Sequence, residues 1–267
     1  MPPPSPPGDT PPDERRMTIG EHLEELRRRV LWAVLYWVAC SAVAAWYSDG
    51  LMGLLLRPFL QALKDTGQKT QIIYLQPTDS FAVVFKVILI VGAFLASPLI
   101  AWELWGFIGK GLYGREKRWI VIGGPISFLL FACGTVFFYF FILPPALEFL
   151  YAYGKDFFPD EPGWTVVQMP SIPDAVSFFL WMSLSMGLVF QIPLVMFLLS
   201  AVGLVPWRSF LHYQRHFILA ATLAAAIITP TGDAVNLTLF MIPILALYYL
   251  GLLAVFLRER GKGKVAS

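Results

Sequence analysis

Six long runs of the sequence contain no Asp, Glu, Lys or Arg, and this feature limits the possible folds more than any other. The runs are Val30–Ser48, Val87–Trp102, Trp119–Leu147, Ala175–Trp207, His216–Gly232 and Ala234–Leu257. A helix needs about 20 apolar residues to cross the roughly 30 Å of hydrocarbon in a bilayer. Because lipid offers no partners to backbone N–H and C=O groups, such spans must satisfy their hydrogen bonds internally, as α-helices do. The sequence therefore predicts an all-α polytopic membrane protein with six transmembrane helices.

The expected spans differ in length and in shape. They cover about 30–48, 81–106, 119–143, 175–203, 216–230 and 235–257. The second includes Lys86, whose long side chain can reach toward a membrane surface. The fifth is the shortest, so it requires a thinner bilayer or shielding by neighbouring helices. Four of the spans contain internal prolines, which predict kinks and hence a concave bundle. These prolines are Pro98, Pro125, Pro193 and Pro243.

Composition supports the membrane assignment and excludes two other classes. The chain is 57% hydrophobic and only 14% charged, whereas soluble domains carry about 25% charged residues. A single water-soluble globule is therefore excluded. The formal net charge of +2 is too balanced to suggest a nucleic-acid partner.

The basic residues predict the orientation of the chain. If the N-terminus is cytoplasmic, fifteen of the 20 Lys and Arg residues lie on that side and four on the other, with Lys86 inside a span. Cytoplasmic loops are enriched in Lys and Arg. We therefore expect both termini to be cytoplasmic.

The ends of the chain differ in composition from the membrane domain, which we place at residues 17–257. Residues 1–16 are rich in proline, which predicts a disordered leader, and residues 258–267 form a basic cytoplasmic tail. Thr18 and Glu21 match the S/T-x-x-E capping box, which predicts a helix that lies at the membrane surface and bends into the first span. Apolar residues at helical spacing within Asp49–Lys64 predict an interfacial helix.

Catalytic motifs are missing from the sequence. It contains neither a G-x-x-x-x-G-K-[ST] phosphate-binding loop nor an H-E-x-x-H metal motif. His212 and His216 are four residues apart and could share a helix face, but the sequence supplies no third ligand nearby. We therefore expect no enzyme activity, no cofactor and no metal site.

Three polar positions allow both a structural and a functional interpretation. Gln191 lies in the longest uncharged run, where it either bonds to another helix or faces a cavity as a polar point. Glu116 is an acid among basic loop residues. It either pairs with these neighbours or acts as the anionic group of a receptor site. Asp233 is placed to cap the last span.

Four short motifs, in order, resemble the TatC family, the multispanning receptor subunit of the twin-arginine protein translocase. The segment His22–Arg27 resembles HLxELR, and Gly111–Tyr113 with Glu116–Arg118 resembles LYxxEKR. Phe190–Pro193 and the Thr229–Thr231 segment followed by Asp233 match two further motifs. The resemblance covers about residues 17–257.

The resemblance implies a glove-shaped bundle that exports folded proteins across the cytoplasmic membrane, driven by the proton-motive force. It assigns Glu25 and Glu116 to the paired arginines of the signal peptide. The motifs around these two acids complete the implied signal-peptide site: Leu23, Arg27, Tyr113 and Arg118.

The resemblance also implies partners. These are single-span TatA- and TatB-like subunits, the lipid bilayer and further copies of the chain. Gln191 would face the groove of the bundle, and the other implied groove and partner-helix contacts are Pro193, Thr229, Pro230 and Asp233. Two positions depart from the family pattern, because Asn236-Leu237 replaces the usual Ser-Gln and Gly232 replaces a common proline.

The residues argue against two other functions. An ion-coupled solute carrier would show internal repeats and ionisable residues at mid-membrane, and the sequence shows neither clearly. A purely structural scaffold would have no need for Glu25 and Glu116.

Overall fold

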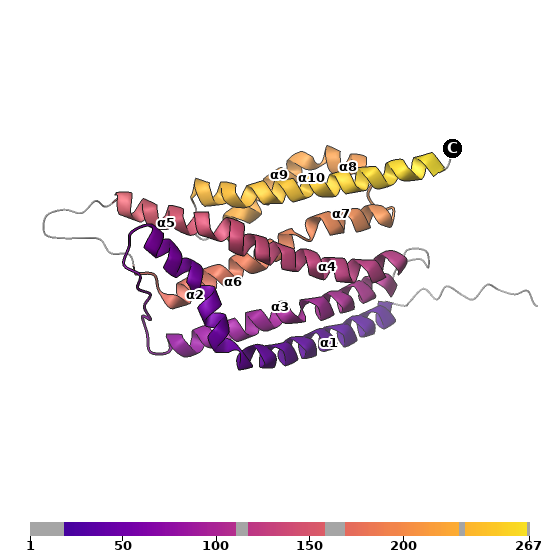
Figure 1. Ribbon diagram of the computed structural model, residues 1–267. Helices are drawn as coiled ribbons and strands as arrows, with labels where there is room; N and C mark the ends of the chain where they lie inside the picture. Colours follow the sequence, from indigo (N-terminus) through magenta and orange to yellow (C-terminus); the bar gives the residue numbers. More distant parts are fainter. Residues whose placement is uncertain (1–18, 111–116, 158–168, 230–232, 266–267) are drawn as a thin grey trace, which may run out of the picture.

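The computed structural model describes residues 19–110, 117–157, 169–229 and 233–265, which are almost entirely helical. Figure 1 shows the long helices lying roughly side by side, with α2 crossing them obliquely. The helices are α1 (Ile19–Trp46), α2 (Ser48–Asp65), α3 (Asp79–Lys110), α4 (Lys117–Phe137), η1 (Phe138–Ile142), α5 (Leu143–Phe157), α6 (Ile172–Val189), α7 (Ile192–Ala201), α8 (Trp207–His212), α9 (Gln214–Ile228) and α10 (Ala234–Val265).

Five stretches of the described residues are long and apolar enough to cross a membrane: Gly20–Trp46, Asp79–Leu104, Gly123–Tyr153, Ile172–Ala201 and Ala234–Gly261. The predicted span at 216–230 corresponds to α9, which has only 15 residues. At 1.5 Å of rise per residue this helix is about 22 Å long, shorter than the hydrocarbon core. The all-helical membrane class is thus confirmed, with five full-length spans where the sequence predicted six.

The first helix differs from its prediction. We expected a surface helix that bends into the first span, but α1 is one uninterrupted helix of 28 residues. It packs along α3, where the two backbones approach closely at Gly92, since a Cβ atom there would lie 2.6 Å from Ser41 Cα. Trp37 Nε1 also donates to the Leu89 carbonyl at 2.7 Å. The rest of α1 exposes large apolar side chains, as expected of a helix that faces lipid.

At two places in the described residues, prolines coincide with a change of helix type or a break in the helix. Pro144 and Pro145 lack the N–H groups that would bond to residues four positions earlier. Just before them the helix widens into the π-helical turn η1, in which Leu143 N–H bonds to the Phe138 carbonyl. The helix then continues as α5 to Phe157, well past the predicted end at residue 143.

The fourth span is broken into α6 and α7. Pro193 cannot donate to the Val189 carbonyl, and α6 ends at that residue. Gln191 lies in the two-residue break, where its backbone N–H bonds to the Leu188 carbonyl. Pro193 is in the first turn of α7, a position that proline tolerates well. The break in this span therefore coincides with the polar side chain of Gln191.

The main core lies between α2, α3, η1, α5 and α6, and α9 and α10 add buried residues to it. Its largest buried side chains include Phe59, Phe138, Leu143 and Leu180. The helix predicted for Asp49–Lys64 is confirmed as α2, which buries Leu55, Phe59, Ala62 and Leu63 in this core, while its position at the membrane interface stays a prediction. One parallel bridge between Ile73 and Ser171 ties the loop after α2 to the start of α6.

The helix ends define two ends of the bundle. In Figure 1, α1 begins and α10 finishes at one end, here called the Glu25 end, whereas α10 begins at the opposite end, here called the Asp233 end. The loop between α9 and α10 is short, because α9 ends at Ile228 and α10 begins at Ala234. The two helices thus form the predicted tight hairpin.

Candidate functional site

Glu25 is the central residue of a charged cluster at the Glu25 end. It lies in the second turn of α1 on the side that faces α3, and only 8% of its surface is exposed. Its Oε1 accepts a hydrogen bond from Arg29 Nε at 2.6 Å, and its Oε2 accepts one from Arg28 Nη2 at 2.8 Å. Both carboxylate oxygens are thus bound by guanidinium groups.

Arg29 joins this cluster to α3. Its Nη1 donates to the Oε2 and to the backbone carbonyl of Glu103, each at 3.0 Å. The guanidinium lies directly over Gly106, where a Cβ atom would come within 2.3 Å of Nη1. Next to it, the His22 ring stacks on Phe107 with centroids 4.4 Å apart. The absence of a side chain at Gly106 therefore makes room for the ion pair between the helices.

The other predicted signal-peptide residues are placed only in part. Leu23 and Arg27 are exposed on α1 near Glu25. Arg118 belongs to the first turn of α4, while Tyr113 and Glu116 lie outside the described residues. The structure therefore fixes the α1 half of the predicted site.

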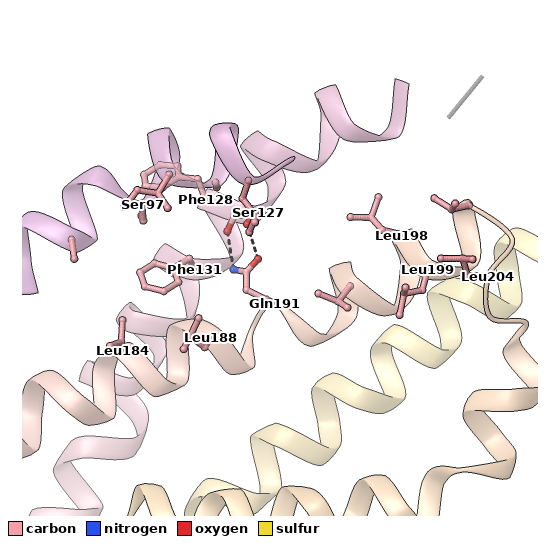
Figure 2. Close-up of a pocket in the computed structure, with 16 residues that line it drawn as sticks. Ser97, Ser127, Phe128, Phe131, Leu184, Leu188, Gln191, Leu198, Leu199 and Leu204 are labelled. Carbon is pink, nitrogen blue, oxygen red and sulfur yellow. Dashed lines mark hydrogen bonds between the residues drawn. The ribbon is translucent and has the colours of Figure 1, made fainter. Parts of the chain in front are cut away.

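Gln191 lines an apolar groove between α3, α4, α6 and α7, shown in Figure 2. The groove encloses about 520 Å³. The Gln191 side chain bonds twice to Ser127 of α4: it accepts from Ser127 Oγ at 2.7 Å, and its Nε2 donates to the Ser127 carbonyl at 2.9 Å. The structural interpretation of Gln191 is thus confirmed, because its amide makes interhelical hydrogen bonds; the amide also lines a cavity, and its contact with a bound helix stays a prediction.

A second hollow of about 770 Å³ lies on the other side of the broken span, toward α9. Leu188, Gln191, Val195 and Leu204 line both hollows. The apolar surface therefore runs from α3 past the break toward the short helix α9.

Thr229 follows the last residue of α9 and Asp233 precedes the first residue of α10, so both lie at the Asp233 end, where α10 begins (Figure 1). Thr229 is buried, and its Oγ1 donates to the Ala225 carbonyl at 2.8 Å. Asp233 Oδ1 accepts from the Asn236 backbone N–H at 2.7 Å, the geometry of an N-cap. The capping interpretation of Asp233 is therefore confirmed. Pro230 lies outside the described residues.

Comparison with known proteins decides the family. Residues 21–243 match the family model described as "Sec-independent protein translocase protein (TatC)". The chain belongs to the TatC family. This result confirms the resemblance that the four motifs carry.

Relatives cover most of the chain. A TatC of Koribacter versatilis is 36% identical over 245 residues, covering 90% of this chain and 86% of the relative. The chloroplastic TATC of Arabidopsis thaliana is 35% identical over 252 residues, covering 93% of this chain and 69% of the relative. A solved structure described as the twin arginine translocase receptor TatC superposes with a TM-score of 0.75 at 30% identity, covering 89% of this chain and 99% of that one.

Membership of the TatC family makes this chain a membrane-embedded component of a protein translocase and not an enzyme. Its departure from the TatC pattern at Asn236 has a structural explanation. Asn236 is buried, and its Nδ2 donates to Asp233 Oδ2 at 2.8 Å. The side chain at this position therefore holds the capping aspartate from a second direction.

Sequence reasoning missed three residues of this TatC chain. Arg29 and Glu103 belong to the Glu25 cluster, and Ser127 binds Gln191. Glu103 carried a usable signal, since it is an acid at the end of an apolar span, where an unpaired charge is costly. Ser127 carried none, because a serine is common inside membrane helices and its partner is distant in sequence.

Proposed function

We propose that this TatC chain is the receptor that binds the paired arginines of twin-arginine signal peptides at the cytoplasmic membrane surface. The observation that supports this most directly is the Glu25 cluster, in which a nearly buried carboxylate already binds guanidinium groups through both oxygens. A site that holds two guanidinium groups of its own chain has the chemistry to hold those of a ligand.

The arginine fork explains why a receptor of this kind rejects lysine. A guanidinium is planar and presents several N–H donors to a carboxylate, whereas a lysine ammonium is a point charge that cannot copy this geometry. Hydrogen bonds to charged groups contribute about 1.5–3 kcal/mol each. With Glu25 and Glu116 each binding one arginine, the site favours Arg-Arg over Lys-Lys.

The charge distribution supports a cytoplasmic location for the Glu25 end. The basic residues Arg27, Arg28 and Arg29 lie in the first three turns of α1, and Arg258 and Arg260 lie in the last turns of α10. Both helix ends are at the Glu25 end. By the positive-inside rule this end faces the cytoplasm, so the carboxylates meet a signal peptide before export.

The hairpin of α9 and α10 supplies the sixth crossing in this proposal. Since α9 is about 22 Å long, it fits only where the bilayer is thinned or where neighbouring helices cover its ends. Such a short span beside α10 gives the chain a natural docking place for single-span TatA- and TatB-like helices. Thr229 and Asp233 lie at the Asp233 end of this hairpin.

The apolar groove at Gln191 accepts the hydrophobic part of the signal peptide. Its lining is almost wholly aliphatic and aromatic, with Ser97, Ser127 and Gln191 as polar points. Glutamine has no titratable group, so Gln191 does not carry protons. The partner subunits and the proton-motive force drive export of the folded cargo bound through its signal.

Site-directed crosslinking to a twin-arginine signal peptide tests this proposal. Glu116→Ala and Glu25→Ala are expected to abolish the crosslink and export while the chain still inserts into the membrane. Glu24→Ala is the matched control, because Glu24 is the neighbouring acid of α1 but is exposed. Undiminished crosslinking and export by the Glu25→Ala, Glu116→Ala double variant would contradict the receptor function.

A further inference from the structure

The two arginines that bind Glu25 differ in how firmly they are held. The Arg28 side chain is 63% exposed, whereas the Arg29 side chain is only 16% exposed. Arg28 contacts Glu25 through one nitrogen. Because its guanidinium stays largely in solvent, Arg28 loses little hydration in this pair and contributes less to it than a buried partner would, so Arg28 can leave Glu25 Oε2 more easily than Arg29 can leave Oε1.

Arg29 is fixed from two sides. Besides Glu25, its guanidinium contacts the carboxylate and the backbone carbonyl of Glu103. Glu103 is itself only 17% exposed, so displacing Arg29 would take a guanidinium away from two poorly solvated carboxylates at once. The loss of one partner from a buried ion pair is strongly destabilising, and Arg29 therefore stays in place when a ligand binds.

From this difference we propose that Arg28 is an internal competitor of the signal peptide for Glu25 Oε2, and that Arg29, held by Glu103, is a positioning residue for the Glu25 carboxylate. This inference rests on the proposed receptor function. A guanidinium of the signal peptide takes the place of Arg28 on Oε2, while Arg29 keeps its bond to Oε1. Glu25 thus binds one arginine of the ligand and one of its own chain.

The two roles predict effects of opposite sign at adjacent positions. A competitor lowers the affinity of every cationic ligand by the same factor, so its removal tightens twin-arginine and twin-lysine peptides equally. Orientation of the carboxylate matters more to a planar fork than to a point charge. Loss of the Arg29–Glu103 contact therefore weakens the twin-arginine peptide more than the twin-lysine peptide.

Titration of the full chain in lipid nanodiscs with fluorescent twin-arginine and twin-lysine signal peptides tests the proposal. Arg28→Gln is expected to lower the Kd for both peptides about two- to fivefold, the range of an exposed ion pair. Glu103→Gln is expected to raise the twin-arginine Kd about tenfold, in line with a hydrogen bond to a charged group, and to reduce the preference over twin-lysine. Arg260→Gln, an exposed charge change on α10, is the control for both.

A double variant separates competition from general charge repulsion. In a Glu25→Gln background, titrated to peptide concentrations high enough to reach its weaker Kd, Arg28→Gln is expected to give no further tightening, because the carboxylate for which it competes is gone. Tightening that persists in this background, or Arg28→Gln binding no more tightly than the unmodified chain, would overturn the competitor role. An unchanged arginine preference in Glu103→Gln would overturn the positioning role.

Failure of the receptor function itself gives a different pattern. In that case the unmodified chain would not bind the twin-arginine peptide, or Glu25→Gln would bind it equally well. Arg28 is exposed, so its substitution leaves the fold intact and keeps the competitor role open to refutation even if a change at Glu103 impairs folding.

Discussion

Removal of the Ser127 hydroxyl is expected to destabilise the chain, because it leaves a polar atom of Gln191 without its donor. Ser127 Oγ donates to Gln191 Oε1 at 2.7 Å, while the second bond, from Gln191 Nε2 to the Ser127 carbonyl, survives in Ser127→Ala. Leaving a buried acceptor unsatisfied costs about 1–3 kcal/mol. Interhelical hydrogen bonds in membranes average nearer 0.6 kcal/mol, with a maximum near 1.7. Because the groove is open on one side, we expect a loss of about 1 kcal/mol.

Ser97→Ala is the matched control, because Ser97 lines the same groove but bonds within its own helix. Its Oγ donates to the Phe94 carbonyl at 2.7 Å, so the loss of its hydroxyl strands no group on another helix. We expect a change within about 0.5 kcal/mol. The free energy of unfolding is measured for each variant by titrating protein in mild detergent with a denaturing detergent.

The double variant Ser127→Ala, Gln191→Leu completes the test. Replacing both partners of a hydrogen bond by apolar groups can be nearly neutral, so this variant is expected to recover most of the stability lost in Ser127→Ala. Equal losses in Ser127→Ala and Ser97→Ala, or strictly additive effects in the double variant, would refute the reasoning that the Gln191 bond joins α4 to the broken span.

Two further predictions concern packing and orientation. Gly92→Ala is expected to destabilise the chain by about 1–3 kcal/mol, because the new Cβ atom meets the backbone of Ser41. Its control is Gly53→Ala, which is expected to be neutral or stabilising, because no atom lies within 4 Å of the Cβ position at Gly53. Equal free energies of unfolding for the two variants would contradict the close approach of α1 and α3. In a cysteine-free background, a membrane-impermeant maleimide added to intact cells is expected to label Thr70→Cys but not Gly261→Cys, and the reverse pattern would contradict a cytoplasmic Glu25 end.

The apolar runs were enough to predict the helices, but not where each helix is interrupted. The uncharged run Trp119–Leu147 continues across Pro144 and Pro145, yet the missing N–H groups widen the turn before them into η1. In the fourth span, the missing N–H group of Pro193 separates α6 from α7. Whether a proline bends, widens or breaks a helix depends on packing around it, which a linear pattern does not contain.

The motifs located Glu25 but not its partners. Three consecutive arginines follow it, and the sequence gives no reason to distinguish Arg28 from Arg29. The two arginines differ because α3 brings Glu103 and Gly106 against Arg29. Asp233 was easier to interpret, because an N-cap is a local interaction that needs only the residues next to it.

The most direct measurement is the ratio of the affinities of a twin-arginine signal peptide and its twin-lysine counterpart for the unmodified chain in nanodiscs. If carboxylates at the cytoplasmic surface bind two guanidinium groups, the twin-arginine peptide binds at least about tenfold more tightly, the equivalent of one charge-assisted hydrogen bond. Equal binding of the two peptides would contradict recognition of the arginine pair by these carboxylates.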